Sequence, residues 1–546
     1  LKPLAIIRLC ERFLQLGIPL TVIDYLKPFL ADEAWVSPVF ECYLTALYES
    51  EKFDLFLSQI KHLEIAEKTL PIFLREAQVY ERLGEHDLSI KSASAAIKLY
   101  PNNPYAWHLL LHVSRRKGSS ERGLKDIVLG MPEEIFYAFD DSKVALINEI
   151  AVHIDANFAD RVLVDWFVQD PYKVATPLTQ IHANALSTRP QVIDNPYVPV
   201  HCGEGVTYSD AFETFTRILV RNVDIRHPDL LDIASPIGQI LSNMKVGDTS
   251  GNITLHKRIP SYVAAFRLAA EMRSKGNDGR DAFRLFSLPE NENDWLPYFE
   301  NIIKTFAPRE KKINDSLESS TLPLTVRGKL NGQGNPVKAA ITELTTNDSI
   351  QSIQLFNNGE EAPRKVLIDV YTAVYFSLMG LLSGLKDLGL QLIVSEQTKA
   401  ALGTWLEDIL RTNYMSVGIS DDELYKITSD DIRRDPLGVV QGIKELLQYV
   451  KVEDLRPVDT PDTIVKSRNI VDETVYSTLQ LSFANNIPLL CIDNRMCELA
   501  FLSGCPAANM KAIVREALSF LSHEERIQSI RTGLVAGTPV PILYTD

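Results

Sequence analysis

The chain has 546 residues with 45% hydrophobic and 23% charged side chains, an ordinary balance for globular proteins, so long disordered tracts are not expected. A single core stops growing well below this length, and we therefore expect about three or four domains. The formal net charge of −15 argues against a protein that wraps nucleic acid with its whole surface, so any such contact should be local.

Cysteine usage and hydropathy indicate a cytoplasmic protein. The six cysteines show no paired spacing, which favours structural thiols in a reducing compartment over disulfides or a zinc site. Charged residues interrupt the apolar positions of residues 1–20, so no signal peptide is expected. The apolar run at residues 373–385 is shorter than the about 20 residues of a membrane span, so no membrane contact is expected. The first residue is Leu1, which is consistent with a fragment or a processed chain.

Residues 1–175 carry a helical repeat. Gly17, Ser50, Gly84 and Gly118 fall 33, 34 and 34 residues apart, each between two helical patterns. The clearest unit has aromatic, small, turn and helix-ending residues at Phe73, Ala77, Tyr80, Gly84, Ala96 and Pro101. The pattern resembles TPR repeats, which implies an α-helical solenoid whose surface docks a protein or peptide partner. A spacer or a dimerisation element is the alternative.

Residues 198–258 predict short strands around one informative segment, ASPIGQILSNMKVGDTSGNI, which begins at Ala234. Ser235 can cap a helix that starts at Pro236, and Gly247 and Asp248 can form a turn before the next strand. The segment resembles the C-terminal, FKBP-like domain of the Gre transcript-cleavage factors. The resemblance implies a small antiparallel α+β domain that binds RNA polymerase. The alternative is a domain that only links its neighbours.

Residues 259–320 predict amphipathic helices that form a connector. This part of the chain is the most basic, and solvated helix faces are the ordinary explanation, with a path for RNA as the alternative. Residues 313–362 are rich in Asn, Ser, Thr and Gly, which predicts a long loop or a few short strands.

Residues 363–515 alternate strand and helix patterns, which is typical of an α/β domain with a parallel sheet. Asp369 ends a buried strand, Asp472 is placed to cap a helix, and Asp493 follows another apolar strand. Open α/β sheets place their sites at the carboxyl ends of strands. Converging carboxylates repel one another unless a cation neutralises them, and oxygen-only ligands select Mg²⁺ or Mn²⁺.

The order of these acids and the segment IPLLCIDNRM resemble PIN nuclease domains. The resemblance implies that Asp369, Asp472 and Asp493 are catalytic and bind the metal, and that the ions activate water for phosphodiester hydrolysis. The family's remaining acid, a glutamate, is expected near Ala401, where this sequence has none. Glu396, at the start of the same predicted helix, is the better substitute, and Glu473 beside Asp472 is a second.

The chain as a whole therefore resembles bacterial proteins that join a TPR solenoid, a Gre-like domain and a PIN-like domain, a multidomain α and α/β architecture. Two functions follow from the resemblance. The first is a divalent-metal-dependent endoribonuclease acting on RNA, single-stranded RNA included, that its Gre-like and TPR parts bring to RNA polymerase or to another protein. The second is a non-catalytic adaptor with a degenerate PIN domain.

Overall fold

The structure is a computed structural model. It describes residues 3–30, 35–186, 198–224, 227–276, 283–286, 289, 291, 294–295, 297–302, 322–330, 334–345, 355–411, 415–420, 423–434 and 437–536. The chain folds into two compact units, Leu1–Leu63 together with Leu288–Asp546, and Glu64–Ser287. Within the described residues, no helix has both the length and the apolar character that a membrane crossing requires.

The N-terminal residues form helix pairs joined by short turns. The pairs are α1 (Pro3–Gln15) and α2 (Pro19–Leu26), α3 (Pro38–Glu49) and α4 (Phe53–Ile60), α5 (Leu70–Arg82) and α6 (His86–Leu99), and α7 (Pro104–Arg116) and α8 (Glu121–Leu129), with a 3-10 turn, η1 (Lys27–Phe29), after α2. Gly17, Gly84 and Gly118 have φ angles of +71°, +76° and +89°, a region that glycine adopts without strain. The predicted helical turns are confirmed at these positions, while the TPR identity of the array stays a prediction.

The second unit continues with more helices and one sheet. Its remaining elements are α9 (Glu134–Tyr137), η2 (Asp141–Lys143), α10 (Val144–His153), α11 (Ala156–Gln169), α12 (Pro171–Ala185), β1 (Cys202–Ser209), β2 (Thr214–Val220), β3 (Leu230–Asp232), α13 (Pro236–Asn243), β4 (Thr249–Ser250), β5 (Ile253–Ile259) and α14 (Ser261–Lys275).

The sheet of this unit has the order β3-β2-β1-β5-β4 and is antiparallel except between β2 and β3. As predicted, Ser235 caps α13, because its Oγ accepts a hydrogen bond from the N–H of Gly238 at 3.1 Å. Leu241 of α13 packs against one face of the sheet with Val206 and Leu255. The resemblance of these residues to the Gre domain stays a prediction.

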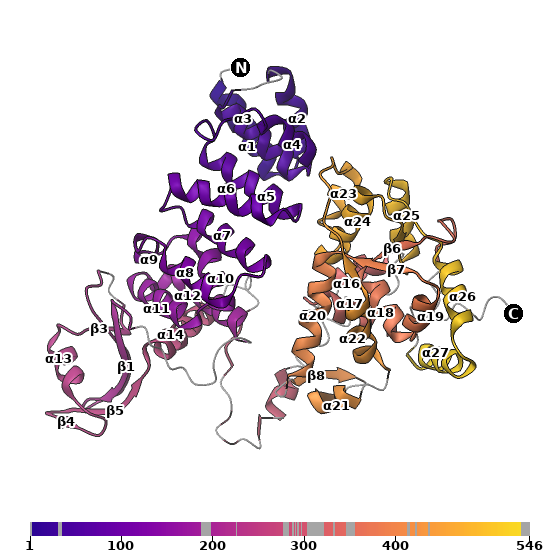
Figure 1. Ribbon diagram of the computed structural model, residues 1–546. Helices are drawn as coiled ribbons and strands as arrows, with labels where there is room; N and C mark the ends of the chain where they lie inside the picture. The colour runs from indigo at the N-terminus through magenta and orange to yellow at the C-terminus, as the bar shows by residue number, and fades with distance from the viewer. Residues whose placement is uncertain are drawn as a thin grey trace. The chain divides into compact units, whose positions relative to one another are not determined.

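Helix α14 differs from the predicted connector. It packs against α12, α11 and β1, so the end of the array, the sheet and α14 share one hydrophobic core (Figure 1). The close approach depends on small residues, since a Cβ at Gly205 of β1 would lie 2.5 Å from the Cβ of Ala264. Residues 283–286, part of a predicted amphipathic helix, form no helix.

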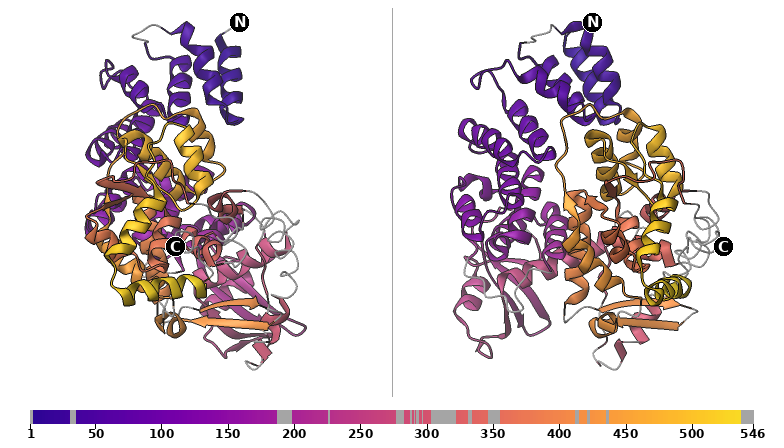
Figure 2. Two further views of the ribbon diagram at one scale, coloured as in Figure 1. Left: turned by 90° about the vertical axis from the view of Figure 1, so that its right-hand side faces the viewer. Right: turned by 45° about the vertical axis from the view of Figure 1, so that its right-hand side comes forward.

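The C-terminal unit is built on a parallel sheet with the order β10-β7-β6-β11. Its elements after residue 363 are β6 (Lys365–Ile368), α18 (Val370–Leu378), α19 (Leu382–Asp387), β7 (Gln391–Val394), α20 (Glu396–Leu410), β8 (Met415–Ser420), β9 (Glu423–Thr428), α21 (Ser429–Arg434), α22 (Val439–Tyr449), β10 (Lys451–Val452), α23 (Asp462–Ser467), α24 (Glu473–Asn485), β11 (Leu489–Leu490), α25 (Asn494–Leu502), α26 (Met510–Phe520) and α27 (His523–Ala536). Strands β8 and β9 pair as a separate two-stranded ribbon (Figure 2).

Both faces of this sheet are buried. Val366 and Ile368 of β6 join the core that contains α18 and α22, while Leu367 and Ile393 pack against Leu481 of α24. Strands buried on both sides explain why the sequence shows continuous apolar runs here rather than alternation.

Two further helices, α16 (Leu324–Leu330) and α17 (Pro336–Thr345), occupy part of the segment predicted to be loop or strand. That prediction is wrong there. Asn335 accepts hydrogen bonds from the N–H groups of Val337 and Lys338 and so begins α17. The C-terminal core runs from Leu324 to Leu521, beyond the predicted limits of 363 and 515, because α16, α17 and α26 pack onto it.

Candidate active site

The carboxyl end of the parallel sheet brings two of the predicted acids together. Asp369 directly follows β6, and Asp493 follows β11, the neighbouring strand that pairs Leu490 with Ile368. Each aspartate caps the helix after its strand. The two charges are close enough for Asp493 to raise the pKa of Asp369, after the larger effect of burial.

Asp369 is 1% exposed and both of its carboxylate oxygens accept a hydrogen bond. The N–H of Thr372 donates to Oδ1 at 2.7 Å, and the thiol of Cys491 donates to Oδ2 at 3.2 Å. Burial raises the pKa of Asp369 to about 6, although these hydrogen bonds oppose the shift. Burial also raises the pKa of the Cys491 thiol, which makes it a structural thiol rather than a nucleophile.

Asp493 is equally enclosed, at 3% exposed. Its Oδ1 accepts from the N–H of Met496 at 3.2 Å. Its Oδ2 accepts twice from Thr325 of α16, from the N–H at 3.0 Å and from the hydroxyl at 3.1 Å. Burial raises the pKa of Asp493 against the effect of these hydrogen bonds.

Asp472 caps α24, as predicted. Its Oδ1 accepts from the N–H groups of Thr474 and Val475 at 2.9 and 3.1 Å and from the Thr474 hydroxyl. Its Oδ2 is buried and has no hydrogen-bond partner among the described residues, and the same is true of the Tyr371 hydroxyl. Burial raises the pKa of Tyr371, and the charges of Asp472, Glu343, Asp369 and Asp493 raise it further, so all three predicted acids act electrostatically on this phenol.

The two candidate glutamates occupy the first positions of their helices, where Glu396 is partly exposed and Glu473 is exposed. Ala401, the position of the expected glutamate, packs against the core. Continuing the register of β6 and β7 places Ser395 beside Asp369.

Ser395 belongs to a buried hydroxyl cluster between α20 and α24 that the sequence analysis missed. Its Oγ lies 2.8 Å from the Ser477 Oγ and accepts from the N–H of Thr398 at 3.1 Å. The Thr398 hydroxyl lies 3.4 Å from that of Thr478. These neutral groups join the two helices next to the acids.

As arranged, these side chains do not fit a metal ion. Among the described residues, no three His, Cys, Asp or Glu side chains are placed to hold one. The predicted three-ligand site is therefore not formed in this conformation, because internal N–H, O–H and S–H donors take the carboxylate oxygens of Asp369 and Asp493. That Asp369, Asp472 and Asp493 ligate an ion stays a prediction.

Helix α16 covers this acidic end of the sheet, and no sequence signal assigned it a role there. Besides the two bonds from Thr325, Arg327 pairs with Glu343 of α17 at 3.1 Å. Lys329 donates to the carbonyls of Val471 and Asn469 at 2.7 and 2.9 Å. The sequence did contain signals for these helices. Pro323 directly precedes α16, and Asn335 followed by Pro336 is a common start of a helix, here of α17.

A turn of the helical array contacts α24 within the same unit. Glu51, between α3 and α4, is 2% exposed, and its Oε2 accepts hydrogen bonds from the Tyr476 hydroxyl and, at 2.6 Å, from the Gln480 amide. Lys52 donates to the carbonyl of Thr460 at 2.8 Å and pairs with Asp462 at 3.2 Å. The turn between α3 and α4 is thus attached to the helix that Asp472 begins.

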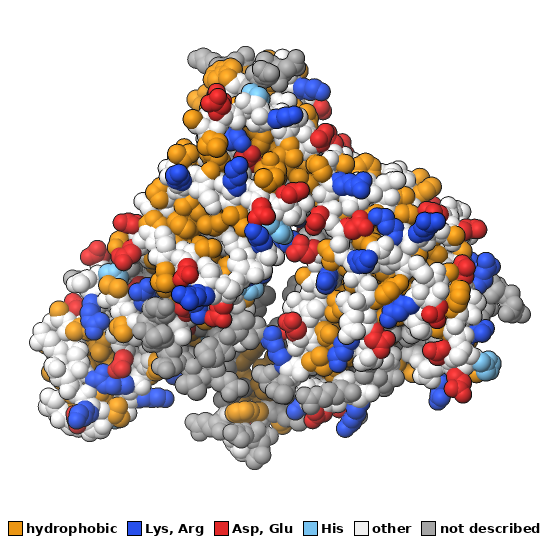
Figure 3. Space-filling model, in the orientation of Figure 1, with side chains coloured by type: hydrophobic (Ala, Val, Ile, Leu, Met, Phe, Trp, Pro, Cys, Tyr) orange, Lys and Arg blue, Asp and Glu red, His pale blue; other side chains and the backbone are white. Residues whose placement is uncertain are grey.

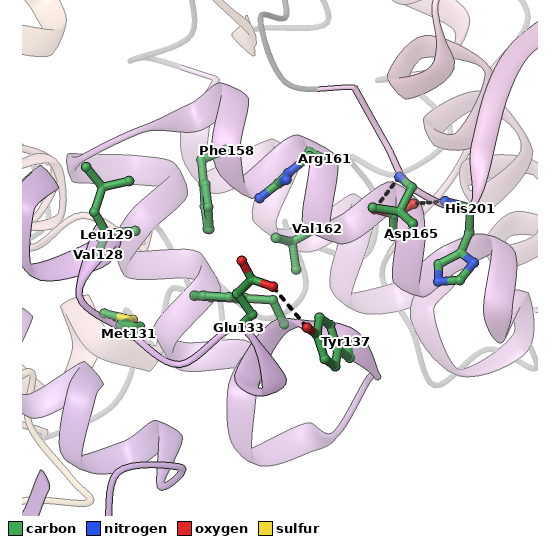
Figure 4. A pocket seen from close by; sticks show the side chains of 12 residues that line it. Val128, Leu129, Met131, Glu133, Tyr137, Phe158, Arg161, Val162, Asp165 and His201 are labelled. Atoms are coloured by element: carbon green, nitrogen blue, oxygen red, sulfur yellow. Dashed lines mark hydrogen bonds between the residues drawn. The ribbon is translucent and has the colours of Figure 1, made fainter.

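The second unit contains a pocket of about 560 Å³ (Figure 4). Its lining is mostly apolar and includes Val128, Met131 and Val162. Arg161 lies over the ring of Phe158, with 5.0 Å between the guanidinium carbon and the ring centre. This pocket has the mixed character of a ligand site but contains none of the predicted acids.

Comparison with known proteins gives one family match. A family model described as a PIN domain associated with the TPR-GreAB-C-PIN system matches residues 367–502. No curated protein and no solved structure matches the chain. The matched residues include Asp369, Asp472 and Asp493 but exclude α16 and α17, and they support a PIN domain in the C-terminal unit.

Proposed function

We propose that the C-terminal unit is a divalent-metal-dependent nuclease of the PIN type that cleaves RNA, and that the structure presents its closed state. One observation carries the proposal. Asp369 and Asp493 are buried, Asp472 is partly buried with its Oδ2 enclosed, and none of the three forms a salt bridge with a basic side chain among the described residues.

The physical argument is the cost of unpaired buried charge. A carboxylate buried without a cation loses its hydration and regains only part of it through neutral donors. Two buried carboxylates and a third that is partly buried are therefore expected to have a functional partner, and a divalent cation is the partner that oxygen-only side chains select. Such an ion would supply positive charge and an activated water for phosphodiester hydrolysis.

The other parts of the chain are proposed to recruit the nuclease. The description of the matching family names TPR and GreAB-C parts beside the PIN domain, which supports the resemblances of residues 1–175 and 198–258. We infer that residues 198–258 bind RNA polymerase and that the helical array binds a protein or peptide. Binding of the full chain to purified RNA polymerase, measured with and without residues 198–258, tests the first of these.

The RNA contact is expected to be short. Over the C-terminal unit, the face drawn in Figure 3 carries Lys and Arg side chains interspersed with Asp and Glu, rather than a continuous basic stripe. Such a surface provides few contacts along a phosphate backbone.

The test is cleavage of single-stranded RNA by the purified full chain with Mn²⁺ or Mg²⁺, stopped by EDTA. Asp493→Asn should lower the rate at least about a hundredfold, because it removes a charged group that the ion needs. Glu498→Gln is the matched control, since Glu498 is exposed on α25, the helix that Asp493 caps.

The second candidate function is a non-catalytic adaptor. Two observations favour it, the alanine at position 401 and the absence of a three-ligand site among the described residues. Two results together would establish the adaptor instead. The wild-type protein would cleave neither RNA nor DNA with any divalent metal, and the Asp493→Asn protein would bind RNA as tightly as the wild type does.

A further inference from the structure

The pocket of the second unit lies between the end of α8, helices α9 and α11, and the residues before β1 (Figure 4). Its floor is apolar, because Val128, Met131 and Val162 line it and all three are buried. The volume of about 560 Å³ lies within the roughly 300–1,000 Å³ of ordinary ligand sites and exceeds that of any single side chain. The pocket therefore has room for more than one apolar group.

The rim of the pocket is also apolar, and it is exposed to solvent. Leu129, Tyr137 and Val200 line the pocket from three different segments and are 73%, 58% and 64% exposed. Single apolar side chains scattered over a surface are ordinary, whereas a group of them around a cavity marks an interaction site. Covering these side chains with the apolar surface of a partner is favourable.

The walls of the pocket are fixed by hydrogen bonds within the unit. Asp165 of α11 accepts the N–H groups of Val200 and His201 at 2.9 and 2.7 Å, one on each carboxylate oxygen, and so holds the segment before β1. Trp166 of the same helix donates to the carbonyl of Phe136 at 2.7 Å and so holds α9. A preformed pocket reduces the entropy cost of ordering its walls when a partner binds.

Two charged side chains of opposite sign line the pocket as well. Glu133, which directly precedes α9, is exposed, and its Oε2 accepts the Tyr137 hydroxyl at 2.9 Å. Its Oε1 accepts no hydrogen bond from the described residues. Arg161 of α11 lies over the ring of Phe158, and a guanidinium carries five N–H donors in one plane. The apolar floor is thus bordered by an acceptor on one side and a donor on the other.

This combination matches a peptide. Each peptide group offers one N–H and one C=O, which a carboxylate and a guanidinium can bind, and the neighbouring side chains can enter the apolar floor. An aliphatic lipid would give neither charged group a hydrogen bond, and the phosphates of a nucleic acid would be repelled by Glu133.

We propose that this pocket binds a peptide segment with two large apolar residues, whose side chains cover the floor and the rim while its backbone bonds to Glu133 and Arg161. The inference rests on the proposed binding of a protein or peptide by the helical array. It adds the site of that binding and the chemistry of the partner.

The test begins with random dodecapeptides displayed on phage and selected for binding to the full chain. The enriched peptides should share two large apolar residues such as Leu, Ile, Met or Phe. A fluorescent synthetic copy of the most enriched peptide should bind the wild type in an anisotropy titration, and this peptide is the probe for the variants.

Two exposed positions of the pocket have matched controls outside it. Leu129→Ala should lower the affinity for the peptide about fivefold, because it removes apolar contact at the rim. Leu99→Ala, at the exposed last residue of α6, should leave the affinity unchanged. Glu133→Ala should lower it about tenfold, because it removes a charged acceptor, whereas Glu134→Ala, at the exposed next residue, should not.

The outcomes separate this inference from the proposed function. Weaker binding by both pocket variants, with both controls at the wild-type affinity, supports the peptide site. Wild-type affinity in Leu129→Ala or in Glu133→Ala, or enriched peptides that lack apolar residues, overturns the site but leaves peptide binding by the array in place. A selection that enriches no peptide overturns both.

Discussion

The contact between Glu51 and helix α24 offers the sharpest perturbation of the C-terminal unit. Glu51→Ala would remove a carboxylate that accepts hydrogen bonds from the Tyr476 hydroxyl and the Gln480 amide, and all three side chains are buried. Tyr476 and Gln480 are four residues apart on α24, so they present their donors on one side of the helix.

The magnitude follows from the donors left behind. A buried donor that loses its acceptor costs about 1–3 kcal/mol, so two such donors predict a loss of about 2–5 kcal/mol after partial relaxation. The backbone strain does not change this estimate. Glu51 has φ of +52°, a left-handed conformation that strains any residue with a Cβ, and alanine keeps this strain.

The repeat supplies its own control. Glu85 stands after Gly84 as Glu51 stands after Ser50, but Glu85 is exposed. Thermal unfolding of the full chain and deuterium exchange of residues 473–485 should show a clear loss for Glu51→Ala and less than about 0.5 kcal/mol for Glu85→Ala. Equal behaviour of the two variants would refute the attachment of the array to α24.

Three further substitutions test the electrostatics and the missing acid. Asp369→Asn should gain stability relative to the wild type as pH rises from 4 to 6.5, measured by urea titration. In the folded wild type the pKa of Asp369 is raised from 3.8 to about 6, so ionisation of this buried group costs the wild type up to about 3 kcal/mol of stability over that range. Burial alone would raise the pKa of Glu149, but hydrogen bonds from His112 and Arg115 lower it to about 2. The stability it contributes is present above pH 4.5 and lost as pH falls toward 2, so Glu149→Gln should cost about 2–3 kcal/mol at pH 7 and little near pH 2 in the same assay. Ala401→Glu should raise Mn²⁺ affinity in calorimetry if the family's glutamate position is vacant, and an unchanged or lower affinity would mean that another group fills it.

Local signals predicted the turns and the helix starts well. The glycines at 17, 84 and 118 have the positive φ that their turns require, and Ser235 and Asp472 cap the helices they were expected to cap. These features depend on a few neighbouring residues, so a single sequence contains the information. The end-of-strand placement of Asp369 and Asp493 was predictable for the same reason.

Features made by distant residues were not predictable. Helix α16 has seven residues and is buried from Leu324 to Gly328, so it has no amphipathic period to detect. The bond between Thr325 and Asp493 joins residues 168 positions apart, and the Glu51 contact with Tyr476 spans 425. In the sequence, Ser50 is only the repeat-turn position that has serine where the other units have glycine. The structure shows that the turn at Ser50 and Glu51 is attached to α24.

The attachments found in the structure converge on one segment. Lys329 of α16 holds the backbone at residues 468–471, Glu51 holds Tyr476 and Gln480, and Asp472 lies between these two contacts. Because Asp472 is fixed from both sides, the position of its Oδ2, which has no hydrogen-bond partner in the described part of the chain, depends on the α3–α4 turn and on α16 together. Loosening either contact should increase the motion of the same carboxylate. The turn between α3 and α4 is therefore connected to the acidic site through a continuous series of packed and hydrogen-bonded groups, the physical requirement for coupling between two sites.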